Sequence, residues 1–101
     1  MADDGGQPDP LIHQPVRLKI MSALKSLNER EMLEFVKLKQ LSGATEGNLG
    51  AHITSLESAG YIEVAKDFHS NRPRTRAKLT RAGRRAFEDY VAYLRSIIGE
   101  G

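Results

Sequence analysis

The stretch from residue 61 to residue 79 most restricts the fold, because it interrupts a chain whose apolar residues otherwise recur at helical spacing. Residues 61–66 combine β-branched and aromatic side chains in the manner of a strand. The segment 69–73, His-Ser-Asn-Arg-Pro, has the composition of a turn, and residues 75–79 can return as a second strand. The sequence therefore predicts a two-stranded hairpin inserted between helices.

Two helices and a short strand are predicted in the first part of the domain. The first helix begins at Pro15, a favoured first-turn residue, and keeps an apolar stripe as far as about Asn28. A very short strand is expected at residues 31–34. The second helix follows directly and is stopped by Gly43, whereas its start is set less sharply because Glu34 is not a favoured N-cap.

Two further helices have clear N-caps. Thr45 can accept hydrogen bonds from free backbone N–H groups, so it begins a third helix that runs to about residue 58. Thr80 begins a last amphipathic helix of about 18 residues, which ends before Gly99. The expected order is helix, strand, helix, helix, strand, strand, helix, which is a mainly α fold with a small β-hairpin (α+β).

Length and composition allow one domain and exclude several kinds of site. In this chain of 101 residues, residues 1–10 are polar and are expected to form a flexible tail, with a single domain over residues 11–99. The chain has no cysteine and only three histidines, so no metal site and no cofactor are expected. No run approaches the ~20 apolar residues of a membrane span, and the first residues do not resemble a signal peptide, so we expect a cytoplasmic protein.

The third helix has a small and polar outer face. Leu49 and Ile53 lie on its apolar stripe, whereas Asn48, Thr54 and Ser55 lie on or near the other side. The major groove of DNA is about 12 Å wide and admits a helix only if its protruding side chains are short. Asn48, Thr54 and Ser55 are therefore candidates for base contacts, although any surface helix can carry polar residues on its outer face.

A run of basic residues follows this helix. Between Phe68 and Phe87 there is no Asp or Glu, whereas the net charge of the whole chain is only +2. Such a cluster would attract phosphates and give salt-sensitive binding, although it can also be a solvated basic face. The basic residues are Arg72, Arg74, Arg76, Lys78, Arg81, Arg84 and Arg85.

The remaining polar residues give no support for catalysis. The chain has no phosphate-binding glycine loop, no metal-protease histidine pair and no serine in a nucleophile-elbow pattern, so we expect no catalytic residues and no enzyme activity. His52 lies beside the apolar stripe of the third helix, where it can support the helix or contact a phosphate. His69 fits an exposed turn better than a metal site.

The sequence resembles short winged-helix regulators related to MarR and ArsR. Residues 11–20 look like the first helix of ArsR-type regulators, and residues 45–53 and 56–62 resemble the recognition helix and strand entry of the related short regulators. Residues 72–75 match their wing, and residues 79–84 match the start of their last helix.

This resemblance implies a winged helix-turn-helix fold, a recognition helix at residues 45–58, a wing at residues 68–78 and dimerisation through terminal helices. Gly50 stands where relatives often have serine, which puts a hydroxyl contact to phosphate at that position in doubt.

The last helix carries more apolar surface than a small core can cover, which favours a homodimer. The alternative is that this helix only closes the core of a single chain. The residues expected at the dimer interface are Phe87, Tyr90, Val91, Leu94, Ile97 and Ile98.

Two functions remain open from the sequence. The first is a DNA-binding transcriptional regulator with double-stranded DNA as partner, its third helix in the major groove and its wing on the backbone or minor groove. The second is a winged-helix protein-interaction module without DNA binding. For the first, an unidentified small-molecule effector could bind between the dimer helices and the wing. The expected DNA-binding residues are Thr45, Asn48, Ala51, His52, Thr54, Ser55, Arg72, Arg74 and Arg76.

Overall fold

The computed structural model describes residues 8–99 and contains four helices and three strands in this range. The predicted order of elements and the α+β class are confirmed. Of the expected tail at residues 1–10, residues 1–7 lie outside the described residues. The elements are α1 (Pro15–Lys25), β1 (Leu33–Glu34), α2 (Phe35–Ser42), α3 (Glu46–Ser58), β2 (Ile62–His69), β3 (Arg72–Leu79) and α4 (Arg81–Ile97).

The first helix ends earlier than expected. It stops at Lys25, because the backbone N–H groups of Ser26 and Leu27 bond to carbonyls three residues back rather than four. Asn28 begins a separate turn, in which its side-chain oxygen accepts from the Arg30 backbone N–H at 3.0 Å. The predicted boundary near Asn28 was therefore three residues too long.

The hairpin is longer than the sequence predicted. Its turn consists of Ser70 and Asn71, both with positive φ (53° and 64°), so pairing begins immediately on either side of these two residues. Pro73, expected in the turn, pairs with Phe68 instead. In an antiparallel ladder, hydrogen-bonded pairs alternate with non-hydrogen-bonded pairs, and the pair next to the turn is hydrogen-bonded. Phe68 and Pro73 therefore form a non-hydrogen-bonded pair, so the proline nitrogen faces away from β2, where no N–H is needed.

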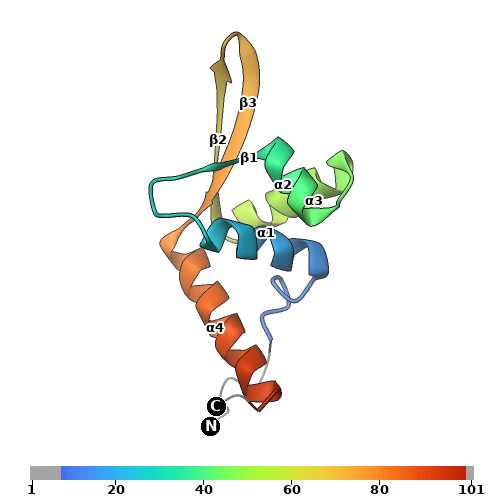
Figure 1. Ribbon diagram of the computed structural model, residues 1–101, viewed down its shortest axis with the longest axis vertical. Helices are drawn as coiled ribbons and strands as arrows, with labels where there is room; N and C mark the ends of the chain where they lie inside the picture. The colour runs from blue at the N-terminus through green and yellow to red at the C-terminus, as the bar shows by residue number, and fades with distance from the viewer. Residues whose placement is uncertain (1–7, 100–101) are drawn as a thin grey trace.

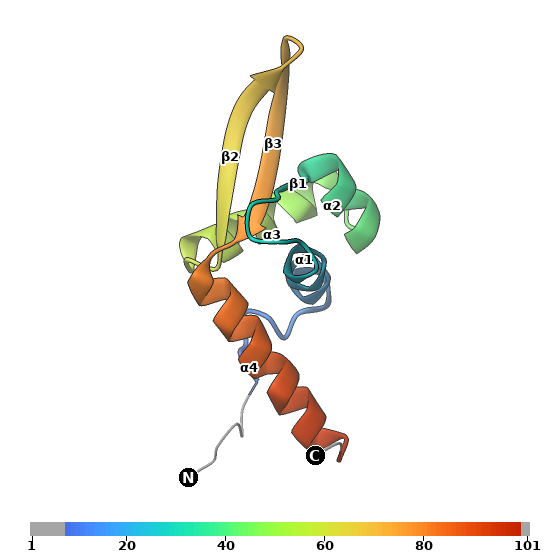
Figure 2. The same ribbon diagram turned by 60° about the vertical axis from the view of Figure 1, so that its left-hand side comes forward.

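The sheet and the first three helices, together with Tyr90 of α4, enclose one core. The strand order is β1-β3-β2, and β1 pairs with β3 only at Ala77 and Arg76. The hairpin therefore projects away from the helices on one side, while α4 projects on the other (Figures 1 and 2). The buried core includes Ile12, Ile20, Met21, Leu24, Leu38, Leu49, Ile53, Leu56, Ile62, Ala77, Leu79 and Tyr90.

The start of α4 is fixed to the end of α3. Gly60 adopts φ +80°, which ends the α3 segment, and its carbonyl accepts from the Thr80 hydroxyl at 2.6 Å. The Thr80 side chain also caps α4 by accepting from the Gly83 N–H, as predicted. Gly83 lies so close to Tyr61 that a Cβ there would overlap the Tyr61 carbonyl. The direction of α4 thus depends on a glycine at this contact.

Candidate nucleic-acid interface

A tight connection sets the position of α3 against α2. Gly43 has φ 72°, a left-handed conformation that ends α2, and its N–H bonds to the Lys39 carbonyl. The buried Ser42 hydroxyl accepts from the Ala44 N–H at 3.3 Å. The Thr45 side chain then accepts from the Asn48 N–H at 3.2 Å, which starts α3 as the sequence predicted. Three residues therefore connect the two helices of a helix-turn-helix.

The outer face of α3 is made of short side chains. Leu49, Ile53 and Leu56 are buried against the core, so the opposite face points away from the protein. A Cβ added at Gly47 would meet nothing within 4 Å, which shows how open this face is. Among the predicted contact residues, Thr45, Asn48, Ala51 and Thr54 are exposed and Ser55 is half-buried.

His52 does not share this outer face. It is half-buried, and its Nδ1 accepts a hydrogen bond from the Arg17 guanidinium at 3.0 Å. Arg17 also donates from Nε to the Leu11 carbonyl at 2.5 Å, so one side chain joins three segments. Burial and the charge of Arg17 lower the pKa of His52, which favours the neutral ring. Of the two roles expected for His52, this geometry favours support of the helix, and no pattern in the sequence indicated that Arg17 is its partner.

An acidic residue of the hairpin binds two of its basic residues. Asp67 accepts a bidentate pair of hydrogen bonds from Arg74, at 3.0 and 2.9 Å, and a third from Arg76 at 3.2 Å. The hydrogen bonds from Arg74 lower the pKa of Asp67, so the carboxylate stays charged. The basic run counted from Phe68 began one residue after this carboxylate and overstated the free charge. Arg72, at the tip, is exposed.

The hairpin and α3 also enclose a shallow groove. A cavity of about 400 Å³ lies between them, with Thr54 and Glu57 on the α3 side and Lys66 and Arg74 on the hairpin side. Lys66 and Glu57 were not among the predicted contact residues. Lys66 is the last residue of the predicted strand, which the structure extends to His69.

The residues predicted at the dimer interface separate into two groups. Tyr90 is only 3% exposed, and its hydroxyl lies 2.7 Å from Nδ1 of His13, so it belongs to the core of the single chain. Of the other five, Phe87, Val91 and Leu94 are half-buried, and Phe87 and Leu94 also pack against the core. Phe87, Val91 and Leu94 line a mainly apolar groove of about 760 Å³ with residues of α1 and α2, and Ile97 and Ile98 are 59% and 69% exposed.

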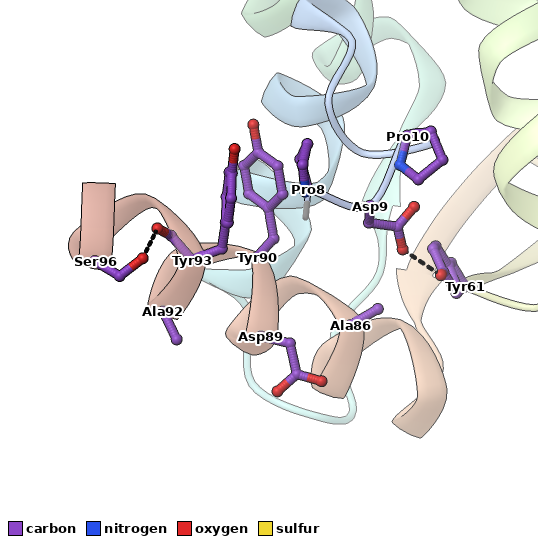
Figure 3. A pocket seen from close by; sticks show the side chains of 10 residues that line it. All are labelled: Pro8, Asp9, Pro10, Tyr61, Ala86, Asp89, Tyr90, Ala92, Tyr93 and Ser96. Atoms are coloured by element: carbon purple, nitrogen blue, oxygen red, sulfur yellow. Dashed lines mark hydrogen bonds between the residues drawn. The ribbon is translucent and has the colours of Figure 1, made fainter. Parts of the chain in front are cut away.

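A second cavity lies on another side of α4. It measures about 950 Å³ and opens between α4 and residues 8–10 (Figure 3). The Tyr61 hydroxyl donates to Asp9 at 2.5 Å, and this bond, more than burial or the charge of Asp9, raises the pKa of Tyr61 to about 12. Tyr90 and Tyr93 lie beside each other on the α4 wall, with ring centroids 6.1 Å apart. The cavity is away from the hairpin, unlike the effector position expected from the sequence.

Within residues 8–99, no cluster of three metal-ligating side chains is present. None of the helices described over the same range combines the length and the apolar character that crossing a membrane requires.

The compact helix-turn-helix followed by a projecting hairpin defines a winged helix. Residues 16–98 match the family described as a winged helix DNA-binding domain, and the chain belongs to this family. The winged-helix regulator fold inferred from the sequence is confirmed.

Individual relatives agree with this assignment. An uncharacterized protein of Methanocaldococcus jannaschii is 37% identical over 81 residues, covering 80% of this chain and 85% of that protein. A transcriptional regulator homologue from Pyrococcus horikoshii OT3 has a TM-score of 0.79 and 30% identity, covering 90% of this chain and 87% of the other. NadR, solved in complex with 4-hydroxyphenylacetate, shares the fold with a TM-score of 0.69 and 22% identity, covering 89% of this chain and 64% of the other.

Proposed function

We propose that this protein is a transcriptional regulator that binds double-stranded DNA as a homodimer. The observation that carries the proposal is the exposed face of short side chains on α3, which lies beside a projecting basic hairpin. A helix of this kind can enter the major groove while the hairpin follows the adjacent backbone or minor groove. The relative from Pyrococcus horikoshii OT3, described as a transcriptional regulator homologue, supports the same function.

Base readout is assigned to the exposed polar residues of α3. Asn48 can form paired hydrogen bonds with adenine, and Thr54 offers a hydroxyl and a methyl group that can contact thymine. Ala51 lets the helix approach closely, and Thr45 can bond a phosphate with its hydroxyl. Ser55, which is half-buried, would act at the edge of this surface.

Phosphate binding is assigned first to Arg72. This residue is exposed at the tip of the hairpin, whereas Arg74 and Arg76 are held by Asp67. Their donors that do not face Asp67 can still contact a phosphate, because a guanidinium carries five N–H groups. We therefore expect Arg72 to contribute more to salt-dependent binding than either of the other two.

We assign the dimer interface to the predicted residues of α4 and its C-terminal end, with Tyr90 excluded because it is buried in the core. The far end of α4 projects from the body (Figure 2), and Ile97 and Ile98 at this end are exposed. Phe87, Val91 and Leu94 of the same helix line the groove described above. A two-fold arrangement would pair these surfaces and present two copies of α3 to half-sites about one DNA turn apart.

The central experiment is a fluorescence-anisotropy titration of random-sequence duplex at two salt concentrations, with the mass measured by light scattering. Binding that weakens steeply with salt, and a mass twice the 11.2 kDa of one chain, would support the proposal. Absence of binding at low salt would instead favour the protein-interaction module.

Variants separate the two kinds of DNA contact. Arg72→Ala should weaken binding to every duplex, whereas Lys25→Ala, with the same charge loss on α1, should have little effect. Asn48→Ala should change the sequence selected from a random pool. Equal losses on selected and random duplexes would remove Asn48 from base readout.

A second pair of variants tests the dimer interface. Ile97→Glu should shift the mass toward one chain, because a charge cannot be buried unpaired in an apolar interface. Ala92→Glu, which places the same charge at an exposed position of α4, should leave the mass unchanged. If both variants keep the mass of the parent protein, this surface is not the interface.

We assign an effector site to the cavity between α4 and residues 8–10. Its volume of about 950 Å³ is within the range of small-molecule sites, and aromatic rings and hydroxyl groups line it. NadR, which shares this fold, was solved in complex with 4-hydroxyphenylacetate, and this complex supports an aromatic ligand as the occupant. A screen of aromatic acids by thermal shift would test the assignment, with loss of the shift in Tyr93→Ala as the expected result.

A further inference from the structure

Phe68, near the tip of the hairpin, is the most exposed large apolar side chain within residues 8–99. It is 74% exposed, compared with 69% for Ile98 and 59% for Ile97 on α4. Phe68 is the second-last residue of β2, and the hairpin formed by β2 and β3 projects from the body on the side opposite to α4 (Figures 1 and 2). Phe68 therefore contributes little to the core and is not part of the surface assigned to the dimer.

The short turn gives Phe68 a fixed apolar neighbour. Because Ser70 and Asn71 alone form the turn, the register places Phe68 directly opposite Pro73. Side chains of such a pair lie on the same face of the ribbon, close together. Pro73 is also exposed, so the two residues form a small apolar tip with a restrained backbone.

This tip is on the face of the hairpin that contains the groove beside α3. Side chains alternate along a strand, so Phe68 shares its face with Lys66 and Val64, both of which line that groove. Asp67, which binds Arg74, occupies an alternate position of β2, whose side chains point to the other face of the ribbon. A duplex bound to α3 would therefore meet Phe68 with its ring directed toward the DNA side of the hairpin.

The charges around the tip favour a nucleic acid over a second copy of the chain. Lys66 and Arg72 are both exposed: Lys66 is two positions from Phe68 on the same face, and Arg72 is next to Pro73, at the turn end of β3. Two such tips brought together would place these cations against each other, whereas DNA offers phosphates to the cations and base steps to the ring. Proteins that bind the minor groove use apolar side chains in this way to open a base step and bend the duplex.

We propose that Phe68, supported by Pro73, inserts as an apolar wedge into the minor groove next to the site of α3 and bends the DNA. The inference rests on the proposed DNA-binding function and adds a deformation of the duplex to it. Such bending favours sequences with flexible pyrimidine–purine steps at positions that no polar side chain contacts.

The experiment measures bending separately from binding. A random-sequence DNA fragment shorter than the persistence length of about 150 base pairs is circularised by ligase, and the rate is compared with and without protein. Anisotropy on the same sequence gives the affinity. We expect the wild-type protein to raise the circularisation rate about tenfold and Phe68→Ala to abolish the increase while it still binds.

Two control variants test whether an apolar side chain suffices at this position and whether the face of the hairpin matters. Phe68→Leu retains an apolar wedge and should keep most of the increase, whereas His69→Ala removes an exposed ring from the opposite face and should behave as wild type. Circular dichroism checks that the variants fold. A wild-type protein that binds without promoting circularisation, or a Phe68→Ala variant that promotes it fully, overturns the wedge and leaves the proposed function intact.

Two further outcomes would also overturn the wedge. If Phe68→Ala lowers the mass in light scattering, the residue belongs to a protein interface and the wedge is wrong. If the wild-type protein fails to bind duplex at low salt, the proposed function fails first, and the wedge fails with it.

Discussion

Nδ1 of His52 accepts a hydrogen bond from the Arg17 guanidinium at 3.0 Å, which ties α3 to the first helix. A guanidinium can only donate, so the ring is neutral and its proton lies on Nε2. The same arginine bonds to the Leu11 carbonyl. The angle of α3 therefore depends on a contact whose partners are 35 residues apart in the chain.

Acid should weaken the fold through His52. Its folded pKa lies below the usual 6.5, so the unfolded state binds more protons and the free energy of unfolding falls as pH drops below about 6.5. His52→Asn places an acceptor oxygen near the Nδ1 position without a titrating group. Urea unfolding at a series of pH values should show a smaller acid loss for this variant. If the free energy of unfolding falls equally with pH in the two proteins, His52 is not a cause of the acid loss.

Release of the arginines held by Asp67 should strengthen DNA binding. Asp67→Asn removes the carboxylate that pairs with Arg74 and Arg76, so both guanidinium groups become available to phosphates. The affinity for random-sequence duplex should rise about tenfold, and the logarithmic salt dependence should steepen by about 0.9 for each added phosphate contact. Anisotropy at several salt concentrations measures both quantities.

The matched control is Glu63→Gln, which makes the same change in net charge closer to the body on β2. Its effect should be clearly smaller than that of Asp67→Asn. Equal increases in the two variants would mean that net charge, and not the release of Arg74 and Arg76, governs the affinity.

A side chain at Gly83 should damage the fold. Its Cβ would overlap the carbonyl of Tyr61, and both partners are backbone, so neither can move without displacing α4. Gly83→Ala should lower the free energy of unfolding by about 3 kcal/mol. Gly50→Ala is the control, because its Cβ meets nothing within 4 Å and alanine should stabilise α3 by about 0.5–1 kcal/mol. Denaturant unfolding of both variants tests the contrast.

Local sequence signals predicted most of the fold. Thr45 and Thr80 cap the helices that they were expected to cap, and Gly43 ends α2 in a left-handed conformation. The apolar stripe of α3 identified the buried side of that helix. These features depend on a few neighbouring residues, so a single sequence contains the information needed to find them.

Features that depend on pairing between segments were missed. Pro73 suggested a long turn, but positive φ values at Ser70 and Asn71 shortened the turn and lengthened both strands. That change placed Phe68 at an exposed tip and brought Asp67 opposite Arg74. The contact between Arg17 and His52 likewise appears only when two helices pack, and no local pattern indicates it.

Alkaline titration should detect the bond that holds the N-terminal segment. Tyr61 donates to Asp9, and its folded pKa is about 12 rather than the usual 10, so stability should fall as pH rises from about 10 to 12. Asp9→Asn should lower the pKa of Tyr61, because it removes the carboxylate acceptor and its charge. Phenolate absorbance measures the ionisation, and Tyr61→Phe identifies which step belongs to this residue. The backbone N–H of Tyr61 bonds to the Leu56 carbonyl near the end of α3, so the hydrogen bond from Tyr61 to Asp9 links residues 8–10 to α3. An Asp9→Asn titration identical to that of the wild type would show that the link contributes nothing.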